Sequence, residues 1–190
     1  MKNWKDIDVF AAIKEGDKDA LSVLFLRYYD YMQHYGLRVI NNQTVVEECI
    51  QELFIYIFES YGRLGDVQQV KAYLFRSLRR RLIEKTKKEK RQNHSSIDTF
   101  QILDIQFSPE DILVQKDTEN LTQHVLVQSL NNLPMRQREA IYLRYYNNLS
   151  TNEIAEIMGV ANQTILNTLY QALKKIRKDE QLNQFFLNRF

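Results

Sequence analysis

The sequence has few of the residues that build turns, crosslinks and membrane spans. Its 190 residues include five glycines, two prolines and one cysteine. So few glycines and prolines argue against a turn-dense all-β fold. The single thiol, Cys49, excludes an internal disulfide and suits a reducing compartment, and its apolar neighbours predict a buried, structural role. No run of about 18 apolar residues is present and the first residues do not resemble a signal peptide, so we expect a cytoplasmic protein without membrane insertion.

The sequence also lacks a large excess of charge of either sign, because its 26 basic residues nearly balance its 24 acidic residues. The formal net charge is only +2, so a case for nucleic-acid binding has to rest on how the charges are distributed. Hydrophobic residues make up 44% of the chain, which is enough for a core and argues against global disorder.

Apolar residues recur at helical spacing through most of the chain, which predicts an all-α fold. We expect two small helical domains, residues 1–91 and 118–190, joined by an acidic linker over residues 92–117. Periodicity lapses between residues 92 and 124, where six acids oppose one lysine for a net of −5. Thr44 with Glu47, and Ser150 with Glu153, fit the spacing of capping boxes at helix starts.

A strongly basic segment closes the first domain. From Arg76 to Arg91, nine cations stand against two anions, a net of +7. An amphipathic helix with aromatic residues at its start and such a charge is a candidate phosphate-binding surface, although a solvated helix face is the simpler alternative. The candidate contacts are Tyr73, Arg76, Arg79, Arg80, Lys85 and Lys87.

The stretch from Ser150 to Arg177 has the pattern of a helix-turn-helix. Ala155, Gly159 and Ile165 fall where this motif needs a small contact residue, a turn glycine and a core aliphatic. An ordinary helical hairpin is the alternative. Asn and Gln amides at the start of the second helix can pair with adenine in the major groove, whereas phosphate contacts would come from arginines of the preceding helix. The candidates are Asn162, Gln163, Thr164, Asn167 and Thr168 for bases, and Arg136, Arg138 and Arg144 for phosphates.

Catalytic and metal-binding patterns are missing from the sequence. His34, His94 and His124 lie far apart without a second ligand at useful spacing, and no glycine-rich phosphate loop or catalytic triad context is present. We therefore expect neither an enzyme nor a bound cofactor or metal. Glu47, Glu48 and Glu52 form an acidic patch that suits a solvated face or a protein contact better than acid–base catalysis.

Three segments, in this order, resemble bacterial sigma factors of the sigma-70 family, in the extracytoplasmic-function group. Residues 46–54 (VEECIQELF) are similar to the family's segment that binds core RNA polymerase. Residues 72–91 (AYLFRSLRRRLIEKTKKEKR) resemble its promoter −10 helix. Residues 130–177 resemble the region that reads the −35 element. The resemblance covers about residues 8–91 and 118–178.

The resemblance implies a protein that binds core RNA polymerase, recognises a two-part promoter and helps to separate its strands. It implies polymerase contacts from Glu48, Gln51, Glu52 and Phe54, and an anti-sigma factor as a further partner. The loop at residues 62–67 would receive a flipped base. The sequence departs from the family at Leu166, Thr168 and Gln171, where Lys and Arg are frequent, and at Arg80 and Glu84.

Two other functions fit parts of the chain. A helix-turn-helix regulator that acts without polymerase would explain the second half, but such regulators carry a ligand or receiver domain in place of a basic-tailed bundle. An interaction adaptor that has lost DNA binding would explain why the stretch between Val160 and Leu173 holds no charged residue.

Overall fold

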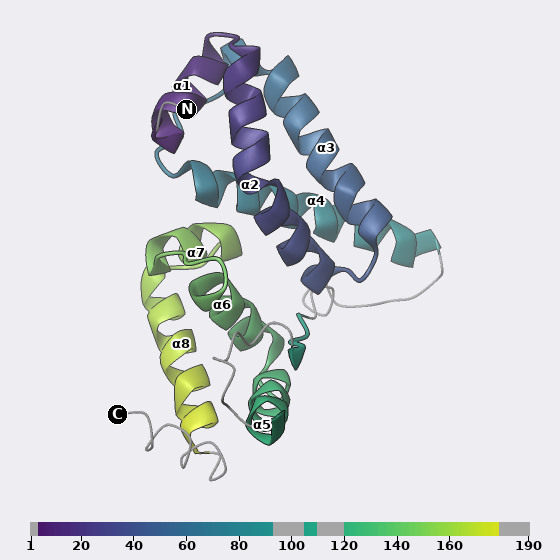
Figure 1. Cartoon of the computed structure of the whole chain (residues 1–190), viewed down its shortest axis with the longest axis vertical. Helices are drawn as coiled ribbons and strands as arrows, with labels where there is room; N and C mark the ends of the chain where they lie inside the picture. Colours follow the sequence, from purple (N-terminus) through teal and green to yellow (C-terminus); the bar gives the residue numbers. More distant parts are fainter. Residues whose placement is uncertain (1–3, 93–104, 110–119, 179–190) are drawn as a thin grey trace. The chain divides into compact units, whose positions relative to one another are not determined.

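The computed structural model describes residues 4–92, 105–109 and 120–178 (Figure 1). Every regular element in these ranges is helical, which confirms the all-α prediction. The chain forms two compact units, and the second begins at Asp104. The helices are α1 (Asp6–Lys14), α2 (Lys18–Val39), α3 (Gln43–Glu59), a 3₁₀ turn η1 (Tyr61–Arg63), α4 (Val70–Gln92), α5 (Asn120–Asn131), α6 (Met135–Tyr145), α7 (Thr151–Met158) and α8 (Asn162–Arg177).

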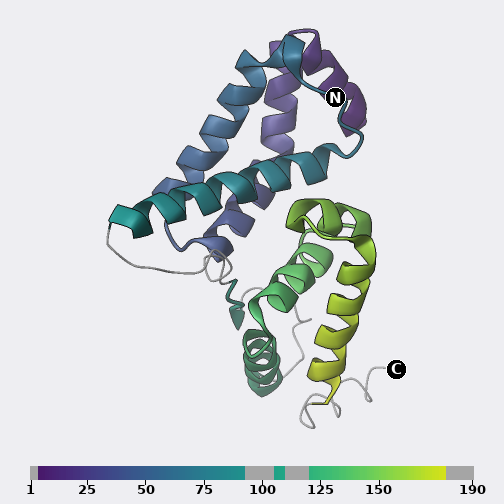
Figure 2. The same cartoon turned by 180° about the vertical axis from the view of Figure 1, so that it is seen from behind.

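In the first unit, α2 and α3 form a helical hairpin, α1 packs on α2, and α4 crosses both α2 and α3 (Figures 1 and 2). The arrangement follows from apolar stripes repeated at three- and four-residue spacing, which each helix buries against its neighbours. The fully buried side chains include Phe10 of α1, Tyr35 of α2, Ile50 and Leu53 of α3, and Phe75 of α4. Burial raises the pKa of the Cys49 thiol to about 11, as expected for the structural role predicted for it.

Short polar residues set the helix starts in this unit. The Asp17 carboxylate accepts hydrogen bonds from the backbone N–H groups of Asp19 and Ala20, as the sequence predicts for the start of α2. The capping box predicted at Thr44 and Glu47 is wrong. Asn42 caps α3 by accepting from the Val45 N–H, so Thr44 already lies inside the helix, where no capping position is left to fill.

The α2–α3 hairpin closes tightly around Gly36, a buried glycine in the last turn of α2. A Cβ atom at this position would lie 2.5 Å from Cγ1 and 3.1 Å from Cγ2 of Val46. Val46 is fully buried, so its side chain has no vacant direction to move into. The glycine therefore sets the distance of closest approach between the two helices.

We expect Gly36→Ala to destabilise the first unit by about 1–3 kcal/mol, because overpacking outweighs the gain in helix propensity. Urea unfolding followed by circular dichroism measures this change. The double variant Gly36→Ala/Val46→Ala should recover part of the loss by removing the clashing methyl groups. A Gly36→Ala protein at least as stable as the wild type would contradict the packing described here.

The second unit is built from α6 and α8, which pack along one another, with α5 contacting α8 (Figure 1). Residues 105–109, which the sequence analysis assigned to the linker, belong to this unit. Ile105 and Phe107 are buried there, and the Phe107 ring packs against Tyr142 and Tyr146 at centroid distances of 6.1 and 5.6 Å. The Asn131 side chain exchanges two hydrogen bonds with the Phe107 backbone, at 2.8 and 3.0 Å. The remainder of the predicted linker, apart from Gln92 at the end of α4, lies outside the described residues.

Candidate nucleic-acid interface

Local chemistry produces the helix-turn-helix between α7 and α8. The Glu153 carboxylate accepts from the Ser150 N–H at 2.8 Å, and the Ser150 hydroxyl accepts from the Glu153 N–H at 3.3 Å, which confirms the predicted capping box. Gly159 ends α7 with a φ of +68°, a conformation that favours glycine. Val160 then returns its N–H to the Ala155 carbonyl at 3.0 Å, which closes the turn before α8 begins at Asn162.

The outer face of α8 carries the side chains predicted to read bases. Gln163, Thr164 and Asn167 are exposed, and the Gln163 amide donates to the Asn167 side-chain oxygen at 3.2 Å. Asn162 and Thr168 are half-buried, and the Thr168 hydroxyl donates to the Thr164 carbonyl at 2.7 Å. Three of the five candidates are therefore exposed on the outer face of α8, and the other two lie at the edge of this face.

The three arginines predicted to contact phosphates take different positions on α6. Arg136 is exposed at its start. Arg144 is also exposed, and its guanidinium donates to the Leu149 carbonyl at 2.9 Å, so it braces the turn before α7. Arg138 is buried, with 7% of its surface accessible, which places it among the packed residues. The phosphate role predicted for Arg138 therefore does not fit its position, because helical periodicity turns this residue toward the core.

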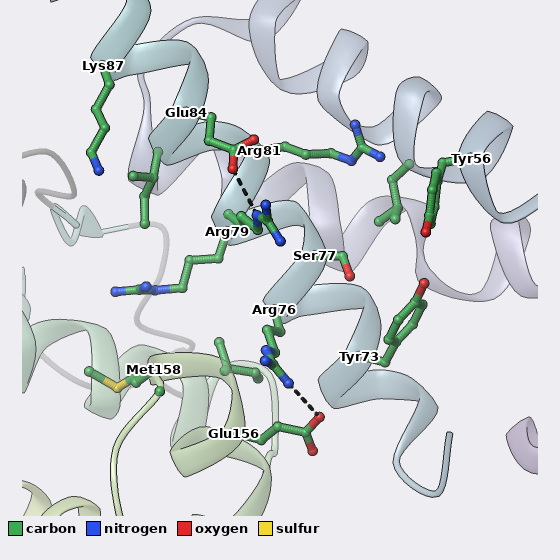
Figure 3. A pocket seen from close by; sticks show the side chains of 15 residues that line it. Tyr56, Tyr73, Arg76, Ser77, Arg79, Arg81, Glu84, Lys87, Glu156 and Met158 are labelled. Atoms are coloured by element: carbon green, nitrogen blue, oxygen red, sulfur yellow. Dashed lines mark hydrogen bonds and ion pairs between the residues drawn. The ribbon is translucent and has the colours of Figure 1, made fainter. Parts of the chain in front are cut away.

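The cations of α4 project from different sides of the helix. Figure 3 shows Arg79 and Lys87 extending from one side, whereas Arg81 extends from the other side toward α3. The side chains of Arg76 and Arg80 are 63% and 81% exposed. Arg80 pairs with Glu84 one turn away at 2.8 Å, an exposed contact that is worth little to stability.

Two of the basic residues hold α4 against α3. The Lys85 ammonium lies 3.0 Å from carboxylate oxygens of both Glu48 and Glu52, and the Arg81 guanidinium lies 3.5 Å from Glu52. The hydrogen bonds to Glu48 and Glu52 raise the pKa of Lys85. A lysine already held by two carboxylates is poorly placed to grip phosphate. Lys85, predicted to contact DNA, and the acids predicted to contact polymerase are therefore partners of one another.

The residues predicted to bind polymerase also divide by exposure. Gln51, Glu48 and Glu52 are exposed on α3. Phe54 is 6% exposed and packs edge-on against Phe25 of α2 at 5.0 Å, so it supports the α2–α3 core instead of presenting a contact surface. Ile55, which is 54% exposed one turn after Gln51, is a further surface residue that was not predicted from the sequence. An aliphatic residue outside the buried stripe of α3 was the available signal.

A second missed residue is Tyr56, which is 50% exposed. Figure 3 shows the hydroxyl ends of Tyr56 of α3 and Tyr73 of α4 directed toward each other. The Arg81 guanidinium lies over the Tyr56 ring, 5.7 Å from its centroid. Burial, followed by the proximity of Tyr56, raises the pKa of the Tyr73 hydroxyl. The two rings and the neighbouring guanidinium combine flat apolar surface with positive charge, which is the composition of sites that bind unpaired bases.

In the part of the chain that the structure describes, no group of three or more histidine, cysteine and acidic side chains could hold a metal ion. No helix within the same residues has the length and hydropathy that crossing a bilayer requires.

The sequence matches the family description "Sigma-70, region 4" over residues 123–176, which includes α6, α7 and all of α8 except its last residue. Curated relatives extend the likeness to both units. The ECF RNA polymerase sigma factor SigW of Bacillus subtilis is 25% identical over 87% of this chain and 91% of its own length. The sigma factor SigV of the same organism is 29% identical over 73% of this chain and 77% of its own.

Two solved structures share the fold. The sigma factor RpoE from Bartonella quintana, determined with the anti-sigma factor NepR, aligns with a TM-score of 0.60 at 22% identity, over 88% of this chain and 98% of that one. CnrH, determined with the cytosolic domain of CnrY, aligns with a TM-score of 0.58 at 16% identity, over 92% and 96%. The matched region and the relatives that span both units support an extracytoplasmic-function member of the sigma-70 family of RNA polymerase sigma factors.

Proposed function

We propose that this protein is an alternative sigma factor that recruits core RNA polymerase to a two-part promoter. The observation that carries the proposal is that the two units present different surfaces, each suited to a different part of a promoter. The first holds a cationic helix with an aromatic pair beside it, and the second holds a helix-turn-helix whose outer face is rich in amides. The protein itself would catalyse no reaction, and it would act in the cytoplasm with core polymerase and promoter DNA as partners.

In this role, α4 would engage the −10 element as its strands separate. Extruding a base from a duplex costs a few kcal/mol, so the separated strand needs compensating contacts. Tyr56 and Tyr73 offer ring faces, and Arg76, Arg79 and Lys87 offer charges for the adjacent backbone. The exposed loop that holds Gly62 and Gly65 would receive the extruded base, as the family resemblance implies.

The second unit would read the −35 element through α8, with Arg136 and Arg144 close to phosphates at the entrance to the groove. No residue between Val160 and Leu173 carries a charge, so this helix alone would bind DNA weakly. Two weak readers held at fixed separation by polymerase gain affinity through effective concentration. The same argument explains why a net charge of +2 suffices for a promoter-binding protein.

An anti-sigma factor is the proposed regulator. RpoE and CnrH, which share the fold, were each determined with a bound partner, named in the first case as an anti-sigma factor. In the first unit of this chain, α3 exposes Ile55 beside Gln51, a surface that polymerase and an inhibitor could compete for. Competition for one surface would keep the protein inactive until the inhibitor is removed.

Run-off transcription with core enzyme tests the proposal, using the DNA upstream of the protein's own coding region as the first template. We expect a transcript of defined length only when both core enzyme and this protein are present. Binding to core enzyme without any transcript from a library of upstream regions would support the adaptor alternative. Sequence-specific DNA binding without core enzyme would support the regulator alternative.

A further inference from the structure

Leu166 is an apolar side chain on the outer face of α8, with 44% of its surface accessible. Leu166 is not part of the buried stripe of α8, which consists of Ile165, Leu169, Ala172 and Ile176. Leu166 lies instead among the amides, next to Asn167 and one turn after Gln163.

A hydrogen bond orders the amides beside Leu166. Because Gln163 Nε2 donates to Asn167 Oδ1 at 3.2 Å, this bond uses neither the Oε1 acceptor of Gln163 nor the Nδ2 donors of Asn167. One acceptor and one donor side by side is the pattern that the N6 amino group and N7 of adenine require in the major groove. The pair is therefore preorganised for adenine.

We propose that Leu166 determines specificity in the −35 element by contacting the C5-methyl group of a thymine next to the adenine read by Gln163 and Asn167. This inference rests on the proposed function. Thymine is the base that presents a methyl group in the major groove, so it is the matching partner for an exposed aliphatic side chain on a recognition helix. A lysine or arginine at this position would instead favour guanine or a phosphate, and would not select thymine.

The pattern on α8 supports a direct apolar contact. Cations first appear near its C-terminal end, where Lys174 lies over the Tyr170 ring at 6.0 Å from the centroid. Phosphate attraction from α8 itself would thus act at its C-terminal end, and base contacts at positions 163–167. The outer face of α8 at positions 163–167 carries no charge, so bases would be discriminated by the paired amides and by burial of a methyl group.

Replacing thymine by deoxyuridine removes only the C5-methyl group and tests the proposal. Holoenzyme containing the full chain first selects its −35 sequence from a randomised promoter library. Each thymine of that element, on either strand, is then replaced by deoxyuridine, and promoter affinity is measured by competition. One replacement should weaken wild-type binding about fourfold, the effect of burying roughly one methyl group. The same replacement should change binding by holoenzyme with Leu166→Ala by less than about 1.5-fold, since the contact it removes is already absent.

Two matched variants keep the test decisive. Leu166→Met preserves an apolar side chain of similar reach and should keep the deoxyuridine effect, whereas Leu166→Lys should bind more tightly at low salt and lose the effect. Circular dichroism should show unchanged helicity, because the position is exposed. Equal deoxyuridine effects in wild type and Leu166→Ala, or a selected element without thymine, would overturn the inference while leaving the proposed function intact. Failure of the wild type to select any sequence would remove both.

Discussion

Replacing Arg76, Arg79 and Lys87 together by alanine is expected to reduce promoter opening by about 10²-fold. Each of these α4 side chains would hold the separated −10 strand, and three contacts to charged phosphates at roughly 1 kcal/mol each account for a loss of this size. The slope of log affinity against log salt should fall by about 2, because single-stranded DNA releases roughly 0.7 counterion per contact. Permanganate reactivity of unpaired thymines, measured at several salt concentrations, reports both quantities.

A charge-matched control separates local contacts from the total charge. Lys2, Lys5 and Lys18 precede α1 or begin α2, and their replacement by alanine removes the same net charge from a part of the sequence outside α4. We expect this control to open promoters within about twofold of the wild type. Equal losses in both triple variants would show that total charge, not the cation set of α4, governs promoter opening.

Ile55→Glu is expected to weaken association with core polymerase by about 100-fold or more. A charge at a buried apolar contact loses the transfer free energy of the side chain and adds a desolvation cost, together about 3 kcal/mol. Since Ile55 is 54% exposed on α3, the folded protein should tolerate the glutamate. Fluorescence anisotropy of the labelled protein titrated with core enzyme gives the dissociation constant.

Tyr31→Glu is the matched control, because Tyr31 is 51% exposed on α2 and also lies in the first unit. We expect this variant to bind core enzyme normally and to unfold at nearly the same urea concentration as Ile55→Glu. Normal core binding by Ile55→Glu would remove this face of α3 from the proposed polymerase interface.

Local signals were sufficient for the parts of the fold that depend on neighbouring residues. The cap formed by Ser150 and Glu153, and the left-handed Gly159, follow from spacing within one turn of helix. The same reasoning failed at Thr44 because Asn42, two residues earlier, is also a good cap. Sequence spacing does not decide between two competent caps, whereas the packing of Val46 into the core fixes where α3 can begin.

The sequence predicted the helices that carry the candidate residues, but not the burial of each side chain on them. Arg138 and Phe54 carry the residue types that DNA and protein contacts use, yet each faces a core formed by other segments. Phe107 is buried by Tyr142 and Tyr146, which lie far along the chain. Burial of this kind depends on tertiary packing, which composition does not reveal. Phe107 was therefore assigned to the acidic linker that surrounds it in the sequence.

The pairing of Lys85 with Glu48 and Glu52 could have been predicted from the spacing of charged residues in the sequence. Glu48 and Glu52 are one helical turn apart, and so are Arg81 and Lys85, so two facing helices can join them in register. Counting charge along α4 treated its cations as equivalent. Their positions around the helix axis separate those that face α3 from those that extend away from it.

The most direct test compares one labelled two-part promoter with this protein alone, with core enzyme alone and with both. The account predicts a heparin-resistant, sequence-specific complex only in the mixture, and its loss when the distance between the −10 and −35 elements is changed by half a helical turn. Specific binding by the protein alone, or a mixture indifferent to that distance, would contradict the claim that polymerase holds two weak helical readers at a fixed separation.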